Sequence, residues 1–82
     1  MKINVRLIGR YKDIAGKQTV HFDLKEGDTL RDVVDNFVKL YPPTEKDKKF
    51  MMVCKNKVLA SYDTMIAKGD EITLIPPVVS GG

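Results

Sequence analysis

Residues 29–43 read Thr-Leu-Arg-Asp-Val-Val-Asp-Asn-Phe-Val-Lys-Leu-Tyr-Pro-Pro, and this stretch decides the fold. Its apolar residues recur at spacings of three and four, which predicts one helix with one apolar stripe. The stripe comprises Leu30, Val33, Val34, Phe37, Leu40 and Tyr41. Thr29 suits the N-cap, with Asp32 as the acid of a capping box. Pro42-Pro43 ends the helix, because proline lacks the backbone N–H and disfavours helix in the residue before it.

Two strands are predicted on the N-terminal side of this helix. Residues 2–7 and 19–24 alternate apolar with polar residues, which is the period of a half-buried strand. The inward residues are Ile3, Val5 and Leu7 in the first strand, and Val20, Phe22 and Leu24 in the second. Between them, residues 9–17 are too long for a tight hairpin, and Tyr11, Ile14 and Ala15 favour a short helical turn.

Three further strands are predicted on the C-terminal side. After a polar loop at 44–49, the apolar run 50–54 indicates a buried strand with the Met51-Met52 pair in the core. A turn at 55–57, where Asn56 tolerates a left-handed backbone, leads into a short strand at 58–59. Residues 68–70 turn again, and 71–75 form the last strand.

The element order is therefore β, β, α, β, a short β and β. One apolar helix stripe and one sheet face that needs covering predict an α+β fold, with a mixed, mostly antiparallel sheet packed on one main helix. The first and last strands are the most apolar, so we expect them to be adjacent and central. The predicted division is a folded domain at 1–76 and an extended functional tail at 77–82.

Composition restricts the possible classes of protein. The 82 residues suit one domain, and 43% apolar with 30% charged residues is typical of an ordinary folded protein. A net charge of +3 is too small for a nucleic-acid footprint. No run approaches the roughly 20 apolar residues of a membrane span, and Met1-Lys2-Ile3 enters a strand pattern without an apolar leader. With Cys54 as the one cysteine, a reducing cytoplasm is expected.

The C-terminal stretch Pro76-Pro77-Val78-Val79-Ser80-Gly81-Gly82 carries the functional signal. The prolines end the last strand and stiffen its exit, and the two glycines are slender enough to enter a narrow channel in a partner. Extended, residues 77–82 reach roughly 20 Å. The terminal carboxylate of Gly82 is a poor electrophile. It becomes reactive when ATP converts it to an acyl-adenylate, from which a sulfur nucleophile displaces AMP to leave a thiocarboxylate.

Several stretches together resemble the MoaD family, the small subunit of molybdopterin synthase. Residues 69–82 resemble its Gly-Asp-Glu-Val, Pro-Pro-Val and Gly-Gly signature, and residues 10–16 resemble the insert after its first strand. Asn56, at the turn before the short strand, also matches. One departure is that Val79 and Ser80 both stand between Pro-Pro-Val and Gly-Gly, where one residue is usual. The tail is thereby longer by about 3.3–3.6 Å.

The resemblance implies a ubiquitin-like β-grasp fold with a flexible Gly-Gly tail, and a thiocarboxylate on Gly82 next to Gly81. It implies no bound cofactor, because ATP is used by an E1-like adenylyltransferase that activates the tail, and a sulfurtransferase supplies sulfur. The large subunit of molybdopterin synthase would then receive the tail, in a heterotetramer, and build the dithiolene from cyclic pyranopterin monophosphate. The carrier itself is expected to be inactive alone, with no nucleic-acid or membrane partner.

The resemblance also implies a docking surface near the tail. The residues assigned to partner binding are Ile8, Leu59, Ile75, Pro76, Pro77, Val78 and Ser80. The basic run Lys46, Lys48 and Lys49 is interpreted as a solvated loop, and His21 as a surface histidine. Cys54 is expected to be a small buried hydrophobic residue.

Three other functions remain open. A covalent modifier of lysines, like the small archaeal modifiers, shares the fold and the Gly-Gly end. A thiamine-type sulfur carrier is a second possibility, although such chains typically lack the 10–16 insert and the Pro-Pro-Val tail. A binding module with idle terminal glycines is the third. The chemical fate of activated Gly82 separates the first two, and deletion of Gly82 identifies the third.

Overall fold

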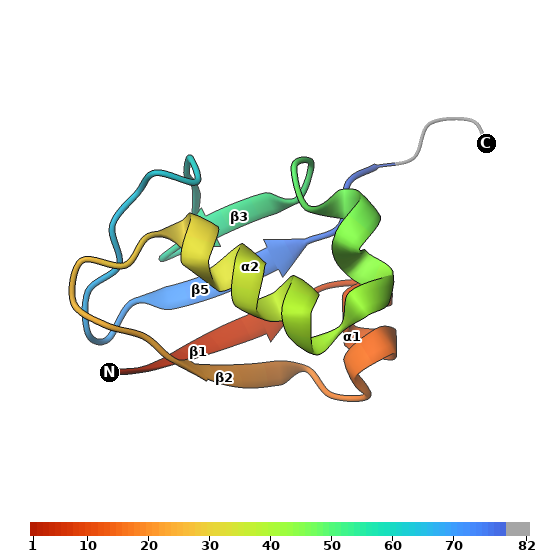
Figure 1. Ribbon diagram of the computed structural model, residues 1–82, viewed down its shortest axis with the longest axis horizontal. Coiled ribbons are helices and arrows are strands. Elements are labelled where there is room, and N and C mark those ends of the chain that lie inside the picture. Colours follow the sequence, from red (N-terminus) through yellow and green to blue (C-terminus); the bar gives the residue numbers. More distant parts are fainter. Residues whose placement is uncertain (79–82) are drawn as a thin grey trace.

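The computed structural model describes residues 1–78 and contains one sheet that packs against one main helix (Figure 1). The α+β prediction and the predicted order of the five strands and the main helix are confirmed, whereas the 3₁₀ helix after the main helix was not predicted. The elements in chain order are β1 (Lys2–Leu7), α1 (Arg10–Ala15), β2 (Thr19–Asp23), α2 (Leu30–Leu40), the 3₁₀ helix η1 (Pro42–Asp47), β3 (Met52–Lys55), β4 (Val58–Leu59) and β5 (Glu71–Ile75).

The sheet has the strand order β2-β1-β5-β3-β4. β1 and β5 are parallel, with Leu7 opposite Leu74, and every other strand pair is antiparallel. The expectation that the first and last strands are adjacent and central is therefore confirmed. Because β1 and β5 run in parallel, their carboxyl ends lie at the same edge of the sheet, and this edge is where the chain leaves toward the tail.

The core lies between α2 and one face of the sheet. β1 alternates exposed and buried residues along its whole length, as its sequence period requires. Phe37 of α2 is fully buried and its ring stacks at a tilt on Tyr11 of α1 and on Tyr41, with 5.1 Å between ring centres in both pairs. The contact with Tyr11 holds the C-terminal half of α2 against α1.

The main helix begins and ends at the predicted residues. The backbone N–H of Thr29 donates to the carboxylate of Asp32 at 2.8 Å, which is one half of the predicted capping box. The predicted apolar stripe needs one correction: Leu40 is exposed, and Val38 is buried in its place. The two residues flank the stripe on opposite sides, and η1 packs beside the flank that carries Val38.

Three other predictions of burial were wrong. Within α1, Tyr11 is buried but Ile14 is partly exposed, because this short helix turns only Tyr11 and, in part, Ala15 toward the core. Phe50 is exposed, because β3 begins only at Met52. The segment predicted as a polar loop at 44–49 is mostly η1, and it buries Thr44 and Asp47.

Candidate functional site

The tail leaves the body beside the loop that follows β1. The backbone N–H of Ile8 donates to the carbonyl of Leu74 at 3.2 Å, which extends the β1–β5 contact by one residue. Gly9 follows with a positive φ of 57°, and a side chain there would stand 3.7 Å from the ring of Pro76. Figure 1 shows α1, η1 and the last described residues at the same end of the body. This end presents the tail.

An apolar patch lies on the sheet face that no helix covers. Residues opposite each other in a sheet point to the same face, so the register identifies the members of this patch. Met52 is opposite Ile75, and Cys54 is opposite both Thr73 and Leu59. Buried Leu74 and Val53 alternate with these residues and point into the core. The open-face patch therefore consists of Ile8, Met52, Cys54, Leu59 and Ile75.

The exposure of the patch fits a docking surface. Leu59 is 63% exposed, Ile8 38% and Met52 37%, while Ile75 and Cys54 are half-buried. Apolar side chains gathered on an open sheet face beside a chain terminus are typical of a surface that contacts another protein. The structure thus brings together three predicted partner-binding residues, Ile8, Leu59 and Ile75. Their role in binding stays a prediction.

Sequence reasoning missed Met52 and Cys54, which it assigned to the core. Met51 is indeed buried, but Met52 points outward, and Cys54 is half-buried on the open face. The signal that could have found them is the strand period. If Val53 faces the core, then both of its neighbours must face away from it.

The remaining predicted site residues belong to the tail. Pro76 and Pro77 are half-buried where the chain leaves the sheet, and Val78 is 85% exposed. The predictions for Ser80, Gly81 and Gly82, and for the flexibility of the tail, lie outside the described residues. The division into 1–76 and 77–82 stays a prediction.

A buried polar cluster supports the end of the body from which the tail leaves. Asp47 of η1 accepts a hydrogen bond from the Tyr11 hydroxyl at 2.9 Å and another from the Arg10 guanidinium at 2.5 Å. Asp47 is 7% exposed, and Arg10 also lies over the Tyr11 ring. This cluster joins α1, next to the root of the tail, to η1. The sequence offered no signal for it, since Asp47 stands among three lysines.

The cluster changes the pKa of each member in a direction that maintains it. Burial alone would raise the pKa of Asp47, but the hydrogen bonds from Arg10 and Tyr11 outweigh it and hold the pKa below the usual value. Burial, and then the hydrogen bond to Asp47, raise the pKa of Tyr11. Asp47 is therefore a carboxylate and Tyr11 a neutral donor at neutral pH.

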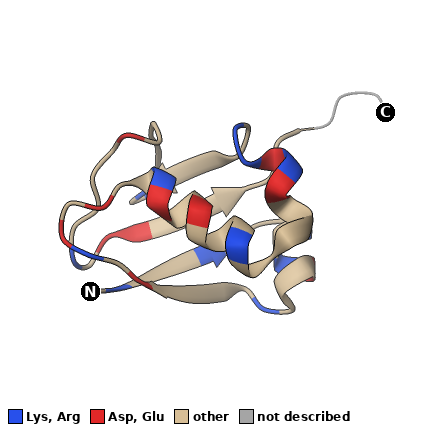
Figure 2. Ribbon diagram, in the orientation of Figure 1, with Lys and Arg blue, Asp and Glu red and all other residues tan. Residues whose placement is uncertain are grey.

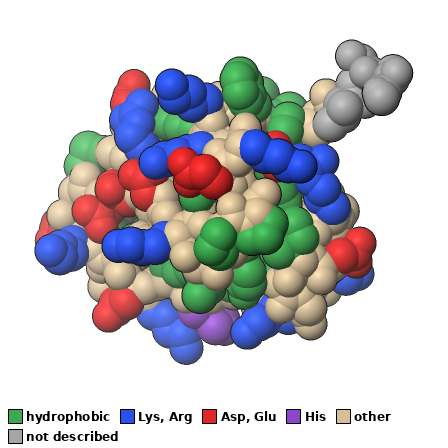
Figure 3. Space-filling model, turned by 45° about the vertical axis from the view of Figure 1, so that its right-hand side comes forward, with side chains coloured by type: hydrophobic (Ala, Val, Ile, Leu, Met, Phe, Trp, Pro, Cys, Tyr) green, Lys and Arg blue, Asp and Glu red, His purple; other side chains and the backbone are tan. Residues whose placement is uncertain are grey.

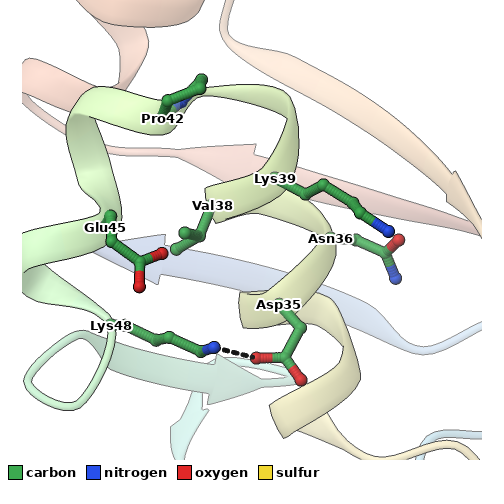
Figure 4. Close-up of a pocket in the computed structure, with 7 residues that line it drawn as sticks. All are labelled: Asp35, Asn36, Val38, Lys39, Pro42, Glu45 and Lys48. Carbon is green, nitrogen blue, oxygen red and sulfur yellow. Dashed lines mark ion pairs between the residues drawn. The ribbon is translucent and has the colours of Figure 1, made fainter.

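A hollow of about 660 Å³ lies on the helix side, between α2 and η1 (Figure 4). Lys48 reaches across it to Asp35, with 3.3 Å between the ammonium and the carboxylate. Because Lys48 and Asp35 form an ion pair, neither of these two charges is free to bind a ligand in the hollow. Within residues 1–78, no group of three or more His, Cys, Asp or Glu side chains is placed to hold a metal ion.

The model of the ThiS family matches residues 5–82. The chain belongs to the ThiS family. The match spans both the residue 10–16 insert and the Gly-Gly terminus. The predicted resemblance to MoaD is thereby confirmed at the level of the ubiquitin-like sulfur carriers of the ThiS and MoaD type.

Individual relatives extend the comparison. The molybdopterin synthase sulfur carrier subunit of Arabidopsis thaliana is 24% identical over 82 residues, which cover 100% of this chain and 84% of the relative. The crystal structure of SAMP1, a small archaeal modifier protein from Haloferax volcanii, is 30% identical with a TM-score of 0.81, covering 100% of both chains. A complex of subunits 1 and 2 of molybdopterin-converting factor from Helicobacter pylori matches at 23% identity and a TM-score of 0.58, covering 99% of this chain and 100% of that chain.

These comparisons confirm the predicted ubiquitin-like β-grasp fold. In the part of the chain that the structure describes, no helix has the length and apolar character needed to cross a membrane. The described side chains of this ThiS-family chain present an apolar surface beside the point where the chain leaves the sheet.

Proposed function

We propose that the chain is the sulfur-carrier small subunit of molybdopterin synthase and acts in the cytoplasm. The observation that carries the proposal is the open-face patch at the root of a Gly-Gly tail. A carrier needs a surface by which partners hold it and a terminus that reaches their active sites, and it needs no catalytic side chains of its own. The likeness to the carrier subunit of Arabidopsis thaliana over the whole chain supports the molybdopterin assignment.

The chemistry takes place at the carboxylate of Gly82. In the first step one carboxylate oxygen attacks the α-phosphate of ATP in an E1-like adenylyltransferase, and pyrophosphate leaves. In the second step a hydrosulfide equivalent from a sulfurtransferase attacks the acyl carbon, AMP leaves, and a thiocarboxylate remains. Both steps are catalysed by partners, and the carrier contributes position.

The loaded tail then enters the large subunit of molybdopterin synthase in a heterotetramer. The thiocarboxylate transfers its sulfur to cyclic pyranopterin monophosphate, and water restores the carboxylate of Gly82. Each carrier delivers one sulfur atom, so the two sulfurs of a dithiolene require two loaded carriers. In the Helicobacter pylori structure a chain of this fold stands in a complex with a second subunit, which supports a partner of this kind.

Covalent modification of lysines is the second candidate function, and the 30% sequence identity to SAMP1 favours it. Both functions share the adenylate on Gly82. They differ in the nucleophile, which is sulfur for a carrier and a lysine amine for a modifier. The open-face patch would serve either function.

The test is the intact mass of the chain after incubation with ATP, its E1-like adenylyltransferase and a sulfur donor. Replacement of one oxygen by sulfur adds about 16 Da. We expect this gain in the full chain and no gain when Gly82 is deleted. Addition of the large subunit and cyclic pyranopterin monophosphate should return the mass to its starting value.

Two results would redirect the proposal. An isopeptide bond to lysine in place of the added sulfur would favour the modifier. An unchanged mass with an activating enzyme that loads another carrier would contradict both functions, and a β-grasp binding module would remain.

A further inference from the structure

The charge of the chain is concentrated at the end that presents the tail. The chain has 14 basic and 11 acidic side chains and a net charge of +3. Segments 8–18 and 39–51 form most of the tail end, and they hold three of the acids: Asp13, Glu45 and Asp47. They also hold seven of the bases: Arg10, Lys12, Lys17, Lys39, Lys46, Lys48 and Lys49. The tail end thus has a net charge of about +4, while the rest of the chain is close to neutral.

Most of these cations are free to meet a partner. Arg10 is paired with Asp47 and Lys48 with Asp35, as described above. The other five, which we call the lysine collar, are exposed: Lys12, Lys17, Lys39, Lys46 and Lys49. Within residues 1–78 no acid lies within ion-pair distance of a collar lysine. Figure 4 shows Lys39 directed alongside Asn36 rather than toward the acids of the hollow.

The collar and the tail share one edge of the molecule. The ladder between β3 and β5 ends at Met52 and Ile75, so the chain that carries Lys46 and Lys49 reaches the sheet at the edge where the tail leaves it. Lys12 lies on α1, three residues after Gly9, where an added side chain would stand 3.7 Å from Pro76. Figure 2 shows Lys and Arg on the segments at this end, and Figure 3 shows basic side chains next to the point where the described chain stops.

We propose that the lysine collar docks on a carboxylate-rich rim around the opening through which a partner protein receives the tail. This inference rests on the proposed function, because it identifies the charge of the surface that the activating enzyme presents. The open-face patch supplies the apolar contact and the collar supplies long-range attraction. An attraction centred on the tail orients the carrier before contact, and so raises the association rate more than the final affinity.

A protein rim fits the collar better than a nucleic acid does. Single-stranded nucleic acids are held by aromatic side chains interleaved with the basic ones. Segments 8–18 and 39–51 contain two tyrosines and one phenylalanine, of which Tyr11 is buried and Tyr41 half-buried. Phe50 is thus the one exposed aromatic of these segments. A tail that must enter a partner also requires the partner to meet this end of the molecule.

The experiment compares two triple variants with the same net charge. The collar variant is Lys12→Gln, Lys46→Gln and Lys49→Gln, and the matched control is Lys2→Gln, Lys25→Gln and Lys68→Gln, at exposed positions outside the tail end. Association of each full chain with its E1-like adenylyltransferase is followed by stopped flow at about 20 mM and at about 0.5 M ionic strength. Adenylation of the wild-type chain is measured in parallel.

We expect the collar variant to associate about tenfold more slowly than the wild type at low ionic strength, with the control within about twofold. The difference should vanish at high ionic strength, where the screening length is only a few ångströms. Equal rates for the two variants, with wild-type adenylation intact, would overturn the collar and leave the proposed function standing. Absence of wild-type adenylation with a competent enzyme would overturn both.

A separate measurement tests whether the lysine collar binds nucleic acid instead of a protein. Fluorescence anisotropy with a labelled single-stranded RNA at about 150 mM salt should show no binding that depends on the collar. Binding of the wild type and the control, lost in the collar variant, would assign the collar to nucleic acid and contradict the proposal.

Discussion

The hydroxyl of Tyr11 donates a 2.9 Å hydrogen bond to the carboxylate of Asp47, and this bond joins two segments that are 36 residues apart in sequence. Arg10 donates to the same carboxylate oxygen. A side chain added at Gly9 would stand 3.7 Å from the ring of Pro76, so the segment fixed by Asp47 also lies close to the root of the tail. The stability of this cluster therefore affects the geometry of the proposed site.

Substitution of Asp47 should destabilise the fold. Asp47→Asn removes a buried charge that two donors share, and we expect the free energy of unfolding to fall by about 1–3 kcal/mol. For a domain of this size, thermal unfolding should shift downward by about 4–8 °C per kcal/mol. The control is Lys46→Gln, one residue away and exposed, which should stay within about 0.5 kcal/mol of the wild type. Equal melting temperatures for the two variants would contradict a structural role for Asp47.

The same carboxylate should make the stability depend on pH. Arg10 and Tyr11 hold the pKa of Asp47 below its ordinary value, so this stabilisation is complete above the unfolded-state pKa of 3.8 and is lost as the pH falls through the lower folded-state pKa. We expect the free energy of unfolding from urea titrations to decrease below about pH 4. Asp47→Asn should flatten this decrease. An equally steep decrease in the variant would assign the acid sensitivity to other carboxylates, such as Asp70, whose pKa is lowered by hydrogen bonds from the backbone of Ala67 and from Asn56.

The open-face patch provides a prediction about activation. Leu59→Ser removes a 63% exposed apolar side chain from the patch, and we expect kcat/KM for adenylation to fall by about 5- to 30-fold. The unfolding free energy should change by less than about 0.5 kcal/mol. Val58→Ser is the matched control, because Val58 is equally exposed but pairs with Lys55 and points to the other face. Equal losses of activity in the two variants would show that exposed apolar area, and not the patch, determines activation.

The turn between β3 and β4 offers a test of backbone strain. Asn56 has a φ of 52°, donates to Asp70 at 3.1 Å and accepts from the backbone of Glu71 at 2.9 Å. Asn56→Gly keeps the backbone conformation and loses both hydrogen bonds, whereas Asn56→Ala also incurs the cost of a left-handed backbone. We expect losses of about 1 and about 2 kcal/mol respectively in urea unfolding. If the Asn56→Ala variant were as stable as the Asn56→Gly variant, the positive φ would not contribute to the loss of stability.

Adenylation of the tail should require that Gly81 and Gly82 carry no side chains. Gly81→Val adds a branched side chain next to the reacting carboxylate, and we expect the rate of adenylation to fall about 10²-fold while the melting temperature is unchanged. Val79→Ala, at a nearby position that already carries a side chain, should leave the rate within about twofold. Normal loading of Gly81→Val, measured by intact mass, would contradict entry of the tail into a narrow channel.

The local parts of the structure follow from the sequence alone. The period of two in β1 and β5, the period of 3.6 in α2, and the turns at Asn56 and Gly69 are properties of neighbouring residues. The capping pair Thr29 and Asp32 is equally local, because its members are three residues apart. The prediction for the tail also needs no tertiary structure, because it rests on residues 76–82 of the sequence alone.

The tertiary structure decides which side chains from distant parts of the sequence meet. The open-face patch combines Ile8, Met52, Cys54, Leu59 and Ile75, and only the strand register shows that they share a face. Asp47 was interpreted as part of a solvated run, yet Arg10 and Tyr11 reach it from a distant segment and stabilise it as a buried ion. Leu40 and Val38 differ in burial because η1 packs beside one flank of α2 and not the other. Periodicity fixes how side chains alternate within one element, whereas burial depends on the neighbour that covers it, and that neighbour comes from elsewhere in the chain.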